Sequence, residues 1–194
     1  VTTGVNNVLI GGLAGDALTD ADNNVAMGKS ALTADTLGSK SVAVGTSALQ
    51  AQNFTTATDS FNTAVGYNAG VAVTTGVQHT IIGALAGDTL TDSGPVVAVG
   101  YEALSTEDRD GGGSTAIGYQ ALKTQNAGTT AFNTAVGWTA GTAVTTGQYN
   151  TLIGADAGDA LTTGSSNTAV GYFALSAEDA HGLNTAIGSR ALGN

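Results

Sequence analysis

The sequence of 194 residues lacks cysteine, so no disulfide stabilises the fold and no particular redox compartment is required. It has one proline, Pro95, as expected where many backbone N–H groups must serve as β-ladder donors. Aromatic residues make up only 5% of the chain. No stretch approaches the roughly 18 consecutive apolar residues that a membrane-spanning helix needs. These shortages exclude a disulfide scaffold, and we expect no membrane insertion of this segment.

Basic residues are also scarce. Five lysines and arginines stand against fifteen acidic residues, which gives a formal net charge of −10. Binding to nucleic acid or to an anionic membrane needs a basic surface, so neither is expected as a partner. The acids are scattered along the chain, as is typical of a solvated surface.

Glycine is abundant, with 29 residues, and much of it belongs to a repeat. One copy reads Asn62-Thr63-Ala64-Val65-Gly66, and Asn133-Thr134-Ala135-Val136-Gly137 is close to it. Successive copies lie 17 to 21 residues apart, most often 17. So short and regular a spacing predicts one coil per repeat, stacked into an all-β solenoid, a parallel β-roll of about eleven coils. We call the glycines on which the copies are centred the key glycines: Gly11, Gly28, Gly45, Gly66, Gly83, Gly100, Gly118, Gly137, Gly154, Gly171 and Gly188.

A longer period of four coils overlies the short one. Gly11, Gly83 and Gly154 begin similar segments 72 and 71 residues apart. An insertion at residues 53–60 recurs at residues 124–131. Duplication of a four-coil unit explains both, so residues 1–194 are interpreted as a single repeat array. Its first residues match segments that close internal coils, and we expect the sequence to be a fragment of something longer.

The residues before each key glycine alternate as in a β-strand. In Thr63-Ala64-Val65 the first and third side chains share one face, and the second points the other way. The residue just before the key glycine is always isoleucine, valine or methionine. One such side chain per coil would stack into an apolar column, so these residues are predicted to form the core ladder: Ile10, Met27, Val44, Val65, Ile82, Val99, Ile117, Val136, Ile153, Val170 and Ile187.

The residue three after the key glycine is alanine in every copy. Such uniformity indicates a crowded place where coils or chains approach closely. We expect these alanines to form a smooth chain–chain interface: Ala14, Ala31, Ala48, Ala69, Ala86, Ala103, Ala121, Ala140, Ala157, Ala174 and Ala191.

Asparagine precedes the key glycine by four residues in seven copies. Stacked asparagines can form a hydrogen-bonded ladder and tolerate the turns that a corner requires. A sugar-binding row is the functional alternative. These residues are Asn7, Asn24, Asn62, Asn133, Asn150, Asn167 and Asn184.

Signals for chemistry are weak. His79 and His181 are far apart in coil order and neither lies near a repeated serine–aspartate pair, so no catalytic residue and no enzyme activity are predicted. No cofactor is expected. Calcium is a possible ligand of oxygen-rich loops, but solvated loop acids are the alternative. The residues concerned are Asp16, Asp88 and Asp159, with the acidic corners 107–110 and 178–179.

Two exposed features are candidates for binding a surface. The insertions offer possible receptor-binding residues: Asn53, Phe54, Thr55, Gln125 and Asn126. Aromatic side chains directly follow five key glycines, where they would cap the roll edge, interlock chains or form a stacking platform for sugar rings: Tyr67, Tyr101, Tyr119, Trp138 and Tyr172.

The segments Lys40-Ser41-Val42-Ala43-Val44-Gly45 and Val97-Ala98-Val99-Gly100 resemble the Ser-Val-Ala-Ile-Gly head repeat of YadA-type trimeric autotransporter adhesins, and related repeats of phage tail fibres. The resemblance covers the whole chain. It implies a left-handed parallel β-roll and three chains packed side by side as a rod. This sequence departs from the family pattern in its longer coils, in threonine at the first strand position, and in asparagine four rather than five places before the glycine.

The resemblance implies a non-enzymatic fibre or adhesin segment, a homotrimer located outside the cell, on a cell surface or on a virion fibre. Its expected role is attachment to a host-surface glycan or protein by loops that project from a stiff rod. A structural spacer rod is the alternative. Ice binding by a flat threonine-bearing face is a further one.

Overall fold

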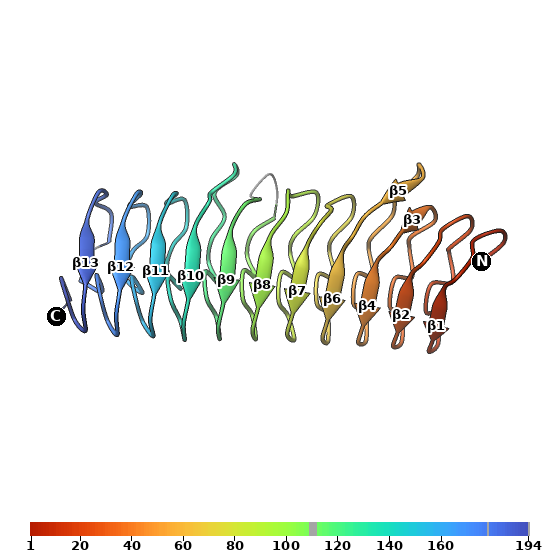
Figure 1. Cartoon of the computed structure of the whole chain (residues 1–194), viewed down its shortest axis with the longest axis horizontal. Helices are drawn as coiled ribbons and strands as arrows, with labels where there is room; N and C mark the ends of the chain where they lie inside the picture. Colours follow the sequence, from red (N-terminus) through yellow and green to blue (C-terminus); the bar gives the residue numbers. More distant parts are fainter. Residues whose placement is uncertain (109–111, 178, 194) are drawn as a thin grey trace.

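The computed structural model describes residues 1–108, 112–177 and 179–193. Within them there is no helix, and eleven three-residue strands stack in one parallel sheet along an elongated rod (Figure 1). The all-β solenoid predicted from the spacing is therefore confirmed. The strands of this sheet are β1 (Val8–Ile10), β2 (Val25–Met27), β4 (Val42–Val44), β6 (Thr63–Val65), β7 (Thr80–Ile82), β8 (Val97–Val99), β9 (Thr115–Ile117), β10 (Thr134–Val136), β11 (Thr151–Ile153), β12 (Thr168–Val170) and β13 (Thr185–Ile187).

Neighbouring strands pair in register, so equivalent residues of successive coils lie directly beside one another. Between β10 and β11, for example, Ala135 pairs with Leu152 and Val136 with Ile153. A second, two-stranded sheet pairs β3 (Gly38–Ser39) with β5 (Thr58–Asp59) at the first insertion. Every column discussed below follows from this register.

The key glycines are required by close stacking between coils. Gly137 has a φ of 147°, and a Cβ added there would lie 2.3 Å from the carbonyl oxygen of Gly154. An L-residue would be strained by the backbone angle and would also collide with the next coil. The repeat is centred on glycine because adjacent coils contact each other through backbone at this corner.

The strand faces are the reverse of the prediction. The middle strand residue points into the coil: Ala135 is 0% exposed, whereas Ile117 and Ile153, in the predicted core ladder, are 38% and 39% exposed. The interior is too narrow for a column of β-branched side chains, and the residues that fit are mostly alanine. The predicted core ladder is therefore wrong and lies on the outer face of the sheet: Ile10, Met27, Val44, Val65, Ile82, Val99, Ile117, Val136, Ile153, Val170 and Ile187.

The predicted alanine interface is also wrong. The backbone N–H of Ala174 donates to the carbonyl of Gly171 at 3.3 Å, and the same turn in each coil directs the alanine inward. A buried methyl group cannot contact a second chain. Ala14, Ala31, Ala48, Ala69, Ala86, Ala103, Ala121, Ala140, Ala157 and Ala174 are buried inside their own chain, and Ala191, in the last coil, is half-buried.

Core volume is shared between the strand and the turn that follows. Coils with alanine in the strand centre mostly place a buried leucine four residues after the key glycine, as Leu122 follows Ala116. Where the interior holds Leu152, the facing residue is glycine instead: a Cβ at Gly141 would lie 2.6 Å from its Cδ1. A large residue at one of the two positions thus goes with a small one at the other in most coils. The exchange of leucine for glycine in the turn, matched by the exchange of alanine for a larger residue in the strand, accounts for part of the four-coil period.

The asparagines form the predicted ladder, mainly from side chain to backbone. Asn150 donates from Nδ2 to the carbonyl of Gly164 at 3.0 Å, and its Oδ1 accepts from the N–H of Asn167 at 2.9 Å. Both partners belong to the next coil. Because Asn150 and its equivalents in the inner coils are buried, these bonds satisfy backbone groups that water cannot reach. Their structural role is confirmed.

Candidate binding surface

The outer face of the long sheet carries two parallel columns. One is the misassigned ladder of isoleucine, valine and methionine, which is half-buried or exposed in every coil. The other is the first strand residue, threonine in β6, β7 and β9 to β13 and valine in the rest. Together they form a strip along the rod that is apolar except for the threonine hydroxyls, and we call it the outer strip. Continuous exposed apolar surfaces are typical of interaction sites, so the outer strip is a candidate for one.

The two insertions rise above the neighbouring loops at β5 and just before β10 (Figure 1). Asn53, Thr55 and Asn126 are exposed, so they remain candidates for contact with a receptor. Phe54 and Gln125 were predicted for the same role, but both are buried. That part of the prediction is wrong, because these two side chains hold the insertions to the core.

The buried side chains form two equivalent polar layers beneath the insertions. Under the first, Gln52 donates to Asp35 at 2.6 Å and accepts from Asn62 at 2.9 Å. Under the second, Gln125 donates to Glu107 at 2.8 Å and accepts from Asn133 at 2.8 Å. A carboxylate, a glutamine and an asparagine thus recur 71 to 73 residues apart. They anchor both loops by the same network, which was not recognised from the sequence.

Burial perturbs two titratable groups in this interior. Desolvation raises the pKa of Glu107 to about 7, and hydrogen bonds from Gln125 and the Ala127 backbone offset part of that rise. Desolvation lowers the pKa of His79 to about 4. Neither ring nitrogen of His79 has a hydrogen-bond partner among the described residues. Both groups face the core, so they influence stability rather than surface chemistry.

Aromatic side chains form a column at the corner after the key glycine. Tyr101 stacks on Tyr119 with ring centroids 5.6 Å apart, and Tyr119 stacks on Trp138 at 4.1 Å, each pair within 12° of parallel. Tyr67 and Tyr172 occupy the same position in other coils and are exposed. Interlocking with another chain is not needed to explain the stack, since rings of one chain already cover one another.

Polar groups border this aromatic column. Lys123 forms an ion pair with Glu102 at 2.5 Å, and Gln120 donates to the same carboxylate at 2.7 Å. Hydrogen bonds from Lys123 and Gln120 lower the pKa of Glu102. One coil further on, the hydroxyl of Thr139 donates to Asp156 Oδ1. The column therefore combines exposed ring edges with oriented carboxylates.

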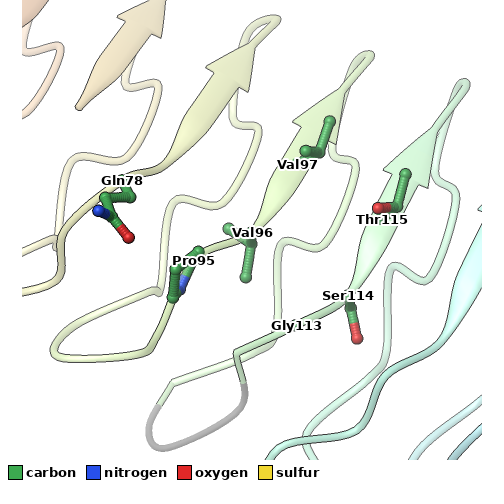
Figure 2. Close-up of a pocket in the computed structure, with 7 residues that line it drawn as sticks. All are labelled: Gln78, Pro95, Val96, Val97, Gly113, Ser114 and Thr115. Carbon is green, nitrogen blue, oxygen red and sulfur yellow. The ribbon is translucent and has the colours of Figure 1, made fainter. Parts of the chain in front are cut away.

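A small hollow lies between the loops that lead into β8 and β9 (Figure 2). It measures about 110 Å³ and is lined by Gln78, Pro95, Val96, Val97, Gly113, Ser114 and Thr115. Ligand pockets usually enclose about 300 Å³ or more. The hollow is too small and too open to serve as a substrate pocket.

Neither histidine belongs to a cluster, since His79 and His181 lie six coils apart. In the described part of the chain no three acidic or histidine side chains converge on a point that could hold a metal ion. Asp16, Asp88 and Asp159 are separated by four coils each, while Arg109, Asp110 and Glu178 of the acidic corners lie outside the described residues. In the described ranges no helix has the length and apolarity to cross a membrane.

Comparison with known proteins gave no match to this chain among family models, curated proteins or solved structures. Functional inference therefore rests on the solenoid, its outer strip, its insertions and its aromatic column.

Proposed function

We propose that this chain is a non-enzymatic segment of an extracellular fibre or adhesin, a homotrimeric rod that attaches to a cell surface. The observation that supports it most directly is the outer strip, whose column of isoleucine, valine and methionine runs through all eleven coils. An isolated rod would leave this strip in water along its whole length. The resemblance to adhesin head repeats supports the same proposal independently.

The trimer buries the outer strip. Ile117 and Ile153 are more than one-third exposed in the single chain, and Val136 between them is half-buried. In a parallel assembly, coils of equal height meet, so each strip would face the same apolar residues of its partners. Interfaces between obligate subunits are richer in apolar area than ordinary surface. The insertions then project in three copies, which suits attachment through several weak contacts.

Sedimentation and cell binding test the two parts separately. We expect sedimentation velocity at micromolar concentration to give a trimer. Val136→Asp, on the outer strip, should shift the protein toward monomer, while Asp179→Asn, in an exposed loop, should not. A well-folded monomer with the strip intact would contradict the trimer.

Attachment is tested with labelled trimer on a panel of bacterial surfaces. We expect saturable binding that weakens when residues 53–60 or 124–131 are replaced by the shorter turns of other coils. A trimer that binds no surface would favour the spacer alternative. Ice binding has less support, because the second outward column holds isoleucine, valine and methionine rather than threonine. Thermal hysteresis without trimer formation would favour it.

A further inference from the structure

The column of residues that follow the key glycines is interrupted twice by alanine. From the fourth coil to the tenth it reads Tyr67, Ala84, Tyr101, Tyr119, Trp138, Ala155 and Tyr172. Backbone hydrogen bonds keep this column in strict register. The N–H of Asp156 donates to the carbonyl of Trp138 at 2.8 Å, and the N–H of Phe173 to that of Ala155 at 3.0 Å. Each alanine therefore stands where a ring would otherwise continue the stack.

The three central rings cover one another and leave two outer faces. Because Tyr119 lies between Tyr101 and Trp138 and is stacked on both, the remaining faces of those two rings look along the rod axis. Trp138 faces Ala155, and Tyr101 faces Ala84. Both alanines are only half-buried, so solvent reaches these positions. Each alanine thus makes a break in the column, which we call a gap, between the aromatic residues of the coils before and after it. Beside Ala155 these are Trp138 and Tyr172, and the Tyr172 ring packs edge-on against Phe173 at 4.6 Å.

The width of each gap restricts what can enter. Two coil steps of about 4.8 Å place the flanking aromatic positions about 9.6 Å apart. Two carbon contacts of about 3.5–4.0 Å take up most of that distance and leave about 2 Å for the thickness of the ligand. A saturated, puckered six-membered ring fits this space better than a flat one, which would contact one wall only.

The polar neighbours indicate a ligand rich in hydroxyl groups. Asp156 lies next to Ala155 and accepts a hydrogen bond from Thr139, so one carboxylate is oriented at the edge of the Trp138 gap. At the other gap the residue equivalent to Asp156 is Leu85, so the polar neighbours are Asn68 and Glu102 of the adjacent coils. Lys123 and Gln120 of the following coil hold the Glu102 carboxylate. Carboxylate and amide groups accept from, or donate to, hydroxyls. The chain's net charge of −10 disfavours polyanionic ligands.

We infer that the two gaps are binding sites for pyranose rings of a neutral glycan, with one sugar stacked beside Trp138 over Ala155 and another beside Tyr101 over Ala84. The apolar C–H face of the sugar would contact the aromatic ring and its hydroxyls the bordering carboxylate. The sites lie four coils, or about 19 Å, apart along the rod, so one polysaccharide chain could occupy both. This inference rests on the attachment proposed above and names its ligand class.

Trp138 is the only tryptophan in the chain, so its emission reports on one gap. The probe is a panel of neutral hexopyranose oligosaccharides, titrated to millimolar concentration. We expect a saturable change in Trp138 emission with at least one member. Ala155→Tyr fills the gap and should weaken that binding at least about tenfold, since a stacking contact is worth this much. Tyr149→Ala removes an exposed aromatic outside the column and should leave binding unchanged.

The outcomes are decisive in both directions. An emission change that survives in Ala155→Tyr, or no change with any oligosaccharide, would overturn the inference. Circular dichroism and sedimentation of Ala155→Tyr establish that its fold and assembly are retained. Cell attachment measured in parallel separates the two proposals: if the double variant Ala84→Tyr/Ala155→Tyr and the parent protein attach equally well, attachment stands and the glycan sites fall.

Discussion

His79 occupies a position that asparagine fills in most other coils, and exchanging the two residues tests how the ladder stabilises the rod. His79 is 1% exposed and its ring nitrogens have no hydrogen-bond partner among the described residues. Its counterpart one four-coil unit later, Asn150, bonds a carbonyl and an N–H of the next coil. In His79→Asn the equivalent partners would be the carbonyl of Ser93 and the N–H of Val96. Two net hydrogen bonds are worth about 2 kcal/mol.

Acid should increase the difference in stability between His79→Asn and the parent protein. The pKa of His79 is about 4 in the folded chain against 6.5 for a free histidine. Because the unfolded chain binds the proton more readily, the stability contributed by neutral His79 is complete above pH 6.5. It is lost as the pH falls toward 4. A difference of 2.5 pKa units corresponds to about 3 kcal/mol. The advantage of His79→Asn should therefore grow from about 2 kcal/mol at neutral pH to about 5 kcal/mol near pH 4.

Urea unfolding followed by far-ultraviolet circular dichroism measures this at neutral pH and near pH 4. The reciprocal variant, Asn150→His, is the matched control and should lose stability with the same pH dependence. Acidic residues elsewhere titrate equally in all three proteins, so they cancel in the comparison. If the parent protein and His79→Asn lose the same stability on acidification, the assignment of His79 as a buried neutral side chain is refuted.

Three further outcomes are expected. Ala135→Asp buries an unpaired charge, so it should lower the free energy of unfolding by several kcal/mol and abolish the β-sheet circular dichroism signal. Val136→Asp, on the outer face, should keep the fold. Equal loss of stability in both variants would mean that both side chains point inward. Burial raises the pKa of Glu107 to about 7, so the folded chain binds this proton more tightly than the unfolded chain does. The free energy of unfolding therefore declines as the pH rises from 4.5 through 7. Glu107→Gln should therefore stabilise the chain at pH 8 by about 2 kcal/mol in urea unfolding, and no gain there would contradict the desolvated carboxyl. Gly137→Ala should lower the midpoint of thermal unfolding sharply, because its backbone angle would be strained and its Cβ would collide with the next coil. Gly12→Ala, with open space around the added methyl group, should leave the midpoint unchanged. If both variants keep the parent midpoint, the close contact between coils at Gly137 is contradicted.

The repeat by itself determined the architecture. A spacing of about 17 residues leaves room for one short strand and its turns, and copies of a unit that cannot bury its own apolar face must stack. The asparagine ladder was also predictable, because a residue that recurs at one corner meets its own copies above and below. Position in the repeat thus specifies which residues lie beside one another along the rod.

The direction in which each face points was decided only by the tertiary structure. Alternation shows that Thr134 and Val136 share a face and that Ala135 lies on the other, but it is symmetrical between inside and outside. The usual rule places the larger apolar residue inside, and here it fails because the closed coil has so little interior. The strand centre must be small wherever the following turn supplies a leucine, so the β-branched residues are left outside. The polar layers beneath the insertions and the gaps in the aromatic column likewise arise only when residues 17 or more apart are brought to the same height by coil stacking.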